Sequence, residues 1–383
     1  MTIPIDYESL RVIWWLFLGV LLIGFAIMDG FDLGVAMLLP YVARSDVERR
    51  VMINSIGPFW EGNQVWLILG GGAVFAAWPP VYAASFSGFY LAMFLVLGTL
   101  ILRPVGFDFR NKFPDIRWRT FWDYALFAAG LVPSLVFGVA FGNLLQGIPF
   151  RIDPDLRILY QGSGLFELLN PFGLLCGLLS VAMLATHGAI YLTSRTDGAV
   201  AARARDVAMV GAATTFLLFA IAGLWVWLGI DGYAITSAIT ADGPSNPLLK
   251  TVARQPHQWF ANYASHPWMI AAPVLGFLGP LLALLLTIIP RPTMAFVASS
   301  GGIFGIIATA GVAMFPFLMP SDIEPAASLT VWDASSSRLT LFVMLLATLA
   351  FLPIVLVYTA IVYRALSGTV TMSMVKKDSA HLY

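Results

Sequence analysis

Charged side chains are scarce in this sequence. Asp, Glu, Lys and Arg make up 11% of the 383 residues, whereas soluble domains carry about 25%. Hydrophobic residues account for 59%, and long apolar runs recur along the chain. The composition therefore excludes a soluble protein and predicts a polytopic membrane protein. The 21 basic and 21 acidic residues balance, so net charge gives no indication of a nucleic acid partner.

Cysteine and histidine are also rare. The single cysteine, Cys176, excludes a disulfide within the chain and the paired-cysteine motifs of redox proteins. Of the four histidines only His187 falls in an apolar run, and a bis-histidine haem needs two that face each other. We expect His187 to be a hydrogen-bonded residue near a helix end. We also expect that the chain binds neither haem nor metal through its own ligands.

Runs of about 20 apolar residues indicate membrane-spanning helices. We predict a single all-α transmembrane domain over residues 1–383. It has nine spans, at residues 11–40, 52–75, 80–102, 121–144, 165–192, 207–229, 268–289, 293–319 and 339–363. The chain begins without the basic region of a signal peptide. The connection at 230–267 is rich in Gly, Pro, Asn and Asp, and we expect it to form a folded cap over the outer face.

Basic residues predict the orientation of the nine spans. With the N-terminus outside, 15 of the 21 lysines and arginines fall in segments on the inner side. Cytoplasmic segments are enriched in Lys and Arg. The asymmetry therefore favours a periplasmic N-terminus and a cytoplasmic C-terminus.

Four carboxylates lie within or beside the apolar runs. Asp29 and Asp32 are three residues apart, which places them on one face of the first span. The rise per residue puts Asp32 and Glu61 each roughly 14 Å from the inner surface, near the middle of the membrane. Asp108 follows the third span on the inner side. Ionisable groups at such depth are usually functional, and these four could form a proton path from the cytoplasm.

Two amides accompany the carboxylate of the second span. Asn63 and Gln64 follow Glu61 directly, and amides can hold water because they both donate and accept hydrogen bonds. A purely structural role is the alternative. A buried acid can hydrogen-bond a neighbouring helix, and an aspartate near Arg103 can form a plain ion pair at the membrane edge.

Two functional hypotheses follow from these residues. One is a proton-coupled transporter with Glu61 as the coupling acid. The other is a cofactor-free subunit of a respiratory complex that supplies a proton path to a partner with redox centres. Transporters commonly show repeats and broken helices around a central site. No clear repeat is found in this sequence.

Several stretches resemble subunit II of the cytochrome bd-type quinol oxidases, including the cyanide-insensitive branch. Together they cover almost the whole chain in order. They are IDYESLRVIWWLFLGVLLIGFAIMDGFDLGVAML, ERRVMINSIGPFWEGNQVWLILGGGAVFAAWPPVYAASFSGFY, RPVGFDFR, FGNLLQGIPF, LLNPFGLL, GIDGY, AMFPF and SLTVWDASSS.

The resemblance implies a haem-free subunit in the bacterial cytoplasmic membrane. Its expected partner is a subunit I that carries haems b and d and oxidises quinol, often with a very small single-span accessory subunit. The implied fold is two four-helix bundles plus a peripheral helix. Some relatives hold a structural quinone. The family's proton supply involves acids that match Asp32, Glu61 and Asp108. A relative has Asp where Glu61 stands, which keeps the carboxylate and shortens its reach.

Overall fold

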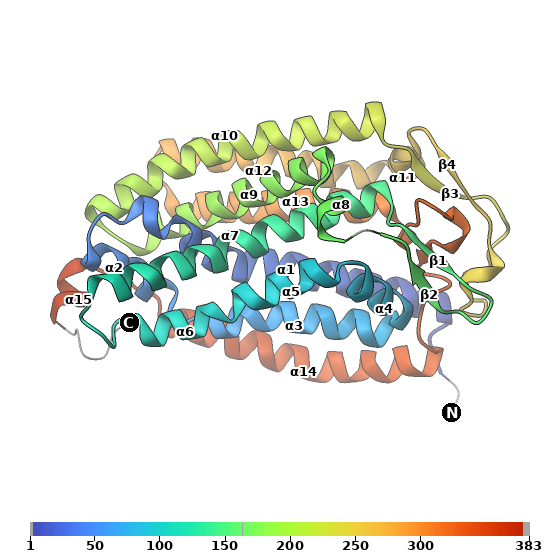
Figure 1. Ribbon diagram of the computed structural model, residues 1–383, viewed down its shortest axis with the longest axis horizontal. Helices are drawn as coiled ribbons and strands as arrows, with labels where there is room; N and C mark the ends of the chain where they lie inside the picture. The colour runs from blue at the N-terminus through green and yellow to red at the C-terminus, as the bar shows by residue number, and fades with distance from the viewer. Residues whose placement is uncertain (1–2, 163, 378–383) are drawn as a thin grey trace.

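The structure is a computed structural model that describes residues 3–162 and 164–377 and is built mainly of helices. Most of the long helices run side by side along the molecule (Figure 1). They are α1 (Tyr7–Val42), α3 (Trp60–Ala77), α7 (Ile116–Gln146), α9 (Pro171–Arg195), α10 (Gly198–Gly229), α12 (Ala271–Ile288), α13 (Pro292–Met314) and α14 (Arg338–Ala365). One further segment of the same direction is divided into α4 (Pro79–Gly88), α5 (Tyr90–Leu100) and α6 (Leu102–Phe109).

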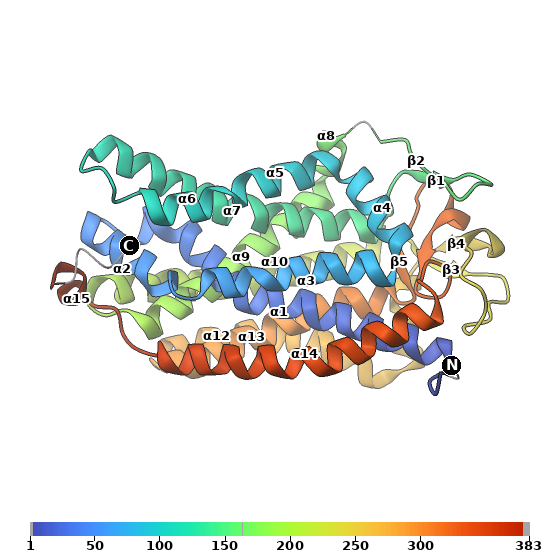
Figure 2. The same ribbon diagram turned by 90° about the horizontal axis from the view of Figure 1, so that it is seen from below.

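Three small hairpins lie at the end of the molecule where α1 begins (Figures 1 and 2). Each is an antiparallel pair of short strands. The pairs are β1 (Phe150–Ile152) with β2 (Ile158–Tyr160), β3 (Gly232–Ile235) with β4 (Val252–Gln255), and β5 (Phe317–Met319) with β6 (Leu329–Thr330). The β3–β4 hairpin lies within the predicted cap at 230–267, and Arg11 of α1 donates to the carbonyls of Ala241 and Gly243 there.

Short helices occupy the remaining connections. At the end opposite the hairpins lie α2 (Asp46–Ile56) and α15 (Met372–Lys377) (Figure 2). Near the hairpins lie α8 (Leu165–Leu168), α11 (Ala261–Ser265) and four short 3-10 turns, at Pro247–Leu249, Gln258–Phe260, Pro267–Ile270 and Pro325–Ala327. Ser45 begins α2 through a capping box with Glu48, in which each side chain bonds the backbone of the other.

Among the described residues, eight helical segments are long and apolar enough to cross a membrane. They are Tyr7–Val42, Tyr90–Phe109, Ile116–Gln146, Pro171–Arg195, Gly198–Gly229, Pro267–Ile288, Pro292–Met314 and Arg338–Ala365. Helix α3 is not one of the eight, because Glu61, Asn63 and Gln64 lower its mean hydropathy. It nevertheless lies alongside α1 and α14 and runs the same way as the other long helices (Figure 2).

The predicted second span, 52–75, differs from the structure. It is divided between α2 and α3, with Gly57, Pro58 and Phe59 between them. Proline lacks the amide proton that would continue the helix. Gly57 and Phe59 of this break are buried, whereas Pro58 between them is exposed. Irregular backbone at membrane depth is tolerated where protein covers it.

Two other observed helix boundaries differ from the predicted ones, and each lies near a proline. The predicted eighth span, 293–319, ends early because α13 stops at Met314 and Pro316 begins the hairpin β5–β6. The helix that corresponds to the predicted fifth span, 165–192, begins later, at Pro171 of α9. The Asn170 side chain caps α9 by accepting from the Gly173 amide, and Pro171 occupies the first helical turn.

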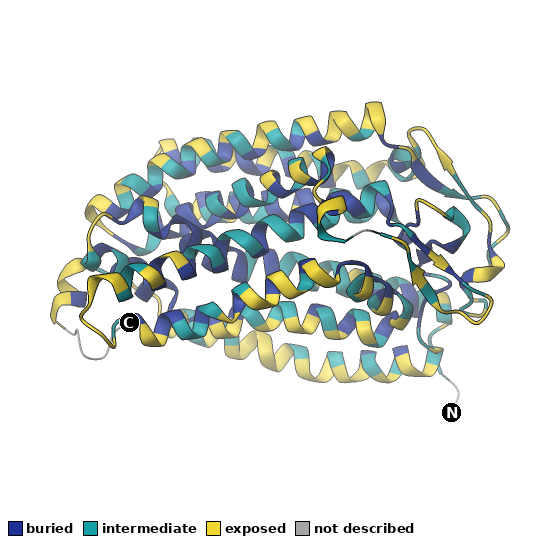
Figure 3. Cartoon of the chain, in the orientation of Figure 1, coloured by how far each residue is buried: buried dark blue, intermediate teal, exposed yellow. Residues whose placement is uncertain are grey.

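Helices α1, α7 and α9 pack against one another and carry many of the buried residues of the bundle (Figure 3). Gly34 of α1 and Gly188 of α9 face each other, and a Cβ on either would overlap the other helix's backbone. Small residues at such crossings let helices approach closely. Helix α14, in contrast, has only Leu341 and Leu345 buried among its residues and lies at the periphery (Figure 3).

Candidate functional site

A buried ion pair joins α1 to α6. The Arg103 guanidinium donates from Nη1 and Nη2 to the two oxygens of Asp29, at 3.0 and 2.8 Å. Both side chains are at most 1% exposed. The guanidinium also lies over the Trp60 ring, with its central carbon 5.5 Å from the ring centroid, and Trp60 stacks on Phe107. Bidentate pairs of this kind fix both direction and position.

Asp32 lies beside this pair on the same face of α1, as its spacing from Asp29 predicts. Its Oδ2 is 4.0 Å from Arg103 Nη2 and accepts a 2.7 Å hydrogen bond from Asn63 Nδ2 of α3. The Asn63 oxygen in turn accepts a 2.7 Å bond from the Tyr363 hydroxyl of α14. Asn63 is thus bonded to protein groups through both its nitrogen and its oxygen.

Charge in this cluster is uneven. One guanidinium faces two fully buried carboxylates, so the group is neutral when Asp32 carries a proton and has one net negative charge when it does not. Among the described residues, Asp32 Oδ1, Arg103 Nε and Trp60 Nε1 are buried without a hydrogen-bond partner. Buried polar atoms nearly always have a partner, and ordered water commonly supplies it. Water beside Oδ1 of Asp32 and Nε1 of Trp60 would supply these missing partners.

Glu61 points away from this cluster. It lies in the first turn of α3 and is exposed, whereas Asn63, two residues later, is 2% exposed. Residues two apart on a helix do not share a face. Glu61 shares its exposed side of α3 with Val65 and Ile68, and Gln64 is half-buried. The structure therefore does not bring Glu61 into contact with the two aspartates within this chain.

Asp108 is also exposed, at the end of α6. Beside it, two aspartates and three arginines join α2, α6 and α7 at the end opposite the hairpins. Arg110 donates to Asp123 and Asp46, Arg49 donates to Asp123, and Arg119 donates to Asp46. This network holds the rim of the bundle near Asp108 through charge-assisted bonds.

His187 has protein partners at both ring nitrogens, as predicted for a hydrogen-bonded residue. Nδ1 lies 3.0 Å from Ser299 Oγ, and Nε2 lies 3.0 Å from the Ile27 carbonyl. Within residues 3–162 and 164–377, no group of three or more His, Cys, Asp or Glu side chains is placed to hold a metal ion.

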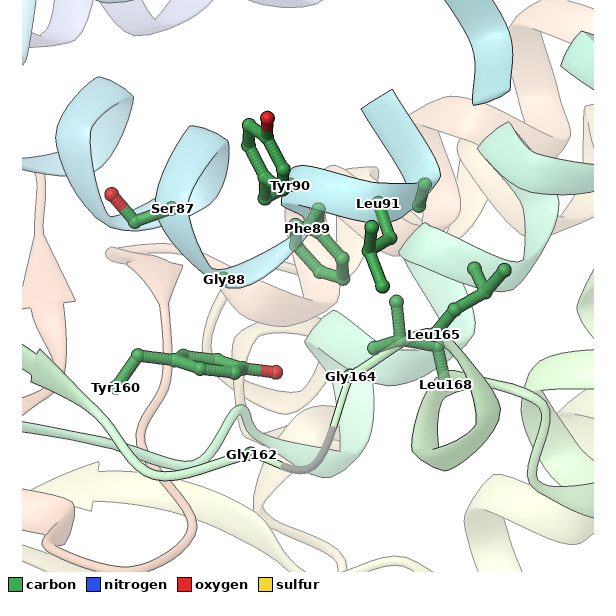
Figure 4. A pocket seen from close by; sticks show the side chains of 11 residues that line it. Ser87, Gly88, Phe89, Tyr90, Leu91, Tyr160, Gly162, Gly164, Leu165 and Leu168 are labelled. Atoms are coloured by element: carbon green, nitrogen blue, oxygen red, sulfur yellow. The ribbon is translucent and has the colours of Figure 1, made fainter. Parts of the chain in front are cut away.

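A cavity of about 220 Å³ lies near the hairpin end, between the junction of α4 with α5 and the segment that follows β2 (Figure 4). Leu91, Leu165 and Leu168 line it, and the Tyr160 ring borders it (Figure 4). The Tyr160 hydroxyl is buried. Burial, with smaller contributions from Glu167 and Asp322, raises the pKa of Tyr160 above its usual value. The volume is small beside the roughly 300–1,000 Å³ of typical ligand pockets.

Sequence reasoning missed two members of the buried cluster. Arg103 was assigned to the inner rim by the charge count, yet it is 1% exposed and reaches Asp29. The alternative named an ion pair of Arg103 with an aspartate at the membrane edge, whereas the pair with Asp29 is buried. Tyr363 carries no signal of its own, because tyrosines near helix ends are typical of the membrane interface.

Comparison with known proteins identifies the family of this chain. The family model described as "Cytochrome bd terminal oxidase subunit II" matches residues 10–366. The chain belongs to this family. It is 54% identical over 379 residues to "Cytochrome bd-I ubiquinol oxidase subunit 2" of Escherichia coli (strain K12), covering 99% of this chain and 100% of that protein. It is 33% identical to "Cytochrome bd ubiquinol oxidase subunit 2" of Bacillus subtilis (strain 168), covering 91% and 93%.

A solved structure shows the same fold. One chain of "The structure of bd oxidase from Geobacillus thermodenitrificans" superposes with a TM-score of 0.70 at 17% identity, covering 93% of this chain and 98% of that one. The chain is therefore a subunit of an oxidoreductase complex and a multi-pass protein of the bacterial inner membrane. Family membership does not favour the transporter hypothesis.

Proposed function

We propose that this chain is the haem-free subunit II of a bd-type quinol oxidase, which couples quinol oxidation to reduction of dioxygen to water and generates a proton motive force. The relatives named as ubiquinol oxidase subunits, aligned over nearly the whole chain, support this assignment. Haems b and d, bound by subunit I, would supply the redox chemistry. Residues of this chain would anchor the complex and conduct protons.

Nine membrane crossings are part of the proposal, with α3 as the ninth. The eight apolar segments alone would return the chain to the side where it began, because each crossing changes sides. Figure 1 instead shows α1 beginning at one end and α15 lying at the other. Contacts among α9, α10, α12 and α13 support one four-helix bundle, and contacts of α1 with α3 and α7, and of α5 with α7, support a second. Helix α14 would be the peripheral helix.

The proposed orientation is supported by the difference between the two ends of the bundle. The rim at α2, α6 and α7 holds the arginines that pair with Asp46 and Asp123, whereas the opposite end holds the hairpins. The excess of basic residues at the α2 end supports a cytoplasmic location for it. The N-terminus would then be periplasmic and the C-terminus cytoplasmic.

The observation that carries the proton path is the excess carboxylate at Asp32. A buried charge without a counter-charge is costly, so the second carboxylate beside Asp29 and Arg103 is the one that would carry the proton. Asp32 lies ten residues before the end of α1, which corresponds to roughly 15 Å from that end. In the proposal Asp108 stands at the cytoplasmic entry, and Asp32 and Asp29 form the buried part.

Glu61 would act at the border with the partner subunit. A carboxylate exposed to lipid near mid-membrane is unfavourable, whereas one that faces a protein cavity is tolerated. The exposed face of α3 therefore supports contact with subunit I, and Glu61 would hand protons across that contact. Gln64, one turn further along and half-buried, would support water there.

Three further partners stay predictions. The cavity beside Tyr160 is too small to argue for a whole quinone, so the structural quinone has no assigned residues. The very small accessory subunit has no assigned surface. Membrane lipid is expected along the exposed side of α14, since only Leu341 and Leu345 of its 28 residues are buried.

The function is tested by Glu61→Gln in the assembled complex. Glutamine keeps the size of the side chain and removes its proton chemistry. We expect slower oxygen reduction, with haem content unchanged in visible spectra. Glu61→Asp should keep most activity, and Glu8→Gln, which removes an exposed carboxylate at the hairpin end, serves as control. Turnover and proton uptake that stay at wild-type values would refute the relay role, and loss of haem would assign Glu61 to assembly.

A further inference from the structure

A directional row of hydrogen bonds connects the peripheral helix to the buried acid. The Tyr363 hydroxyl donates to Asn63 Oδ1, and Asn63 Nδ2 donates to Asp32 Oδ2, each at 2.7 Å. An ionised carboxylate accepts hydrogen bonds and cannot donate them, so the amide must present its NH₂ group to Asp32. Its oxygen then faces Tyr363, whose hydroxyl must donate. The ionised carboxylate thus selects one of the two orientations of the amide, and the Tyr363 hydroxyl holds it there by donating to the amide oxygen.

This row is a tether and does not conduct protons. A side-chain amide does not titrate near neutral pH, so Asn63 cannot pass a proton from Tyr363 to Asp32. What it does is occupy Oδ2 of Asp32. The other oxygen, Oδ1, is buried and has no hydrogen-bond partner among the described residues, and the same holds for the Nε1 donor of Trp60.

We propose that Tyr363 is a positioning residue for proton transfer: by anchoring the amide oxygen of Asn63 it holds the Asn63 NH₂ group on Oδ2 of Asp32 and leaves Oδ1 as the oxygen that binds and releases the proton. The ionisable groups around Asp32 are Asp29 of the same helix, Arg103 of α6, Tyr191 of α9 and Tyr363 of α14. Arg103 is committed to both oxygens of Asp29. The inference rests on the proposed proton path and names one atom within it.

The surroundings of Tyr363 fit a positioning role. Its ring stacks on Phe59 at the break between α2 and α3, with centroids 4.6 Å apart. The Arg195 guanidinium lies over the same Phe59 ring. The two buried residues of α14 are near its other end, so the contact at Tyr363 holds this end of the helix against α3. A phenylalanine at 363 can keep the stacking and lose only the hydroxyl.

The test uses the complete complex and the variants Tyr363→Phe, Asn63→Leu and the double variant. Asn63→Leu removes the amide at nearly constant size and leaves α14 unchanged. Each single variant should slow oxygen reduction by roughly five- to tenfold, which corresponds to one hydrogen bond. Each should also change the pH profile and the carboxyl band of Asp32 in redox-induced infrared difference spectra, identified by its loss in Asp32→Asn. The double variant should add nothing, because both changes break the same row.

Tyr358→Phe is the matched control. It removes a hydroxyl from an exposed position of the same helix and should leave turnover and the carboxyl band unchanged. Additive effects of Tyr363→Phe and Asn63→Leu, or a carboxyl band unaffected by both, would overturn the inference while the proposed path stands. Wild-type turnover and proton uptake in Asp32→Asn would refute the path itself. If the Tyr363→Phe complex does not assemble, the carboxyl band of Asp32 in Asn63→Leu tests the inference alone. A changed band supports it, and an unchanged band overturns it.

Discussion

Glu61 and Asn63, two residues apart on α3, face opposite sides of the helix. Asn63 is buried against Asp32 and Tyr363, and Glu61 is exposed on the outer side. The polar stretch at Glu61–Asn63 therefore has one side chain directed into this chain and one directed out of it. Its amide completes the interior of this chain, and its carboxylate is available to whatever covers α3 in the complex.

The ion pair between Arg103 and Asp29 should be essential for a stable complex. We expect Arg103→Ala to leave two buried carboxylates without a cation and to cost about 3–5 kcal/mol. The assembled fraction on native gels and the thermal unfolding midpoint of the purified complex measure this. Arg117→Ala, at an exposed position, should change neither. An unfolding midpoint equal to wild type in Arg103→Ala would contradict the prediction.

The crossing of α1 and α9 should not tolerate a side chain at Gly34. A Cβ there overlaps the backbone of Leu184 and Gly188, and neither can move without shifting α9. We therefore expect Gly34→Ala to reduce assembly and thermal stability. Gly72→Ala is the control, because nothing lies within 4 Å of its added Cβ. Equal stability of the two variants would show that the helices are further apart than the structure places them.

The hairpin end should depend on a second buried pair. Lys250 Nζ lies 2.9 Å from Asp333 Oδ2, and their side chains are 2% and 7% exposed. Lys250→Met should leave Asp333 uncompensated and make the 230–267 segment sensitive to protease in the intact complex. Adding Asp333→Asn should restore much of the resistance, because it removes the orphaned charge. Sensitivity that rises further in the double variant would contradict this account.

Acid should weaken the start of α2 through Glu48. Burial alone would raise the pKa of Glu48, but Arg203 and the amides of Arg44 and Ser45 lower it below its ordinary value of 4.5. A carboxyl group with a lowered folded-state pKa contributes full stability above its ordinary pKa and loses it as pH falls through the folded value. Glu48→Gln should therefore reduce the unfolding temperature at neutral pH and converge with wild type in acid.

Two observations check the Glu48 prediction. Asp155→Asn, at an exposed turn of the hairpin end, should run parallel to wild type at every pH. A difference between Glu48→Gln and wild type that is independent of pH would mean that the capping geometry, and not the charge, carries the effect.

The sequence predicts local relationships within one helix and leaves most contacts between helices open. The spacing of Asp29 and Asp32 was enough to place them on one face. The same periodicity implies that Glu61 and Asn63 diverge. The sequence could not show which side chains complete the cluster around Asp29 and Asp32. Arg103, which binds Asp29, is 74 residues away from it, and Tyr363, which binds Asn63, is 300 residues away from it. Helix boundaries also depended on single prolines whose effect is clear only in three dimensions.

The three-residue break at Gly57–Phe59 sets the rotation of everything that follows it. One residue more or fewer between α2 and α3 would turn α3 by about 100° about its axis. Gly62 or Gln64 would then take the place of Asn63 opposite Asp32, and Glu61 would leave its present direction. The length of this linker therefore determines which side chain of GPFWEGNQ is presented inward and which is presented outward.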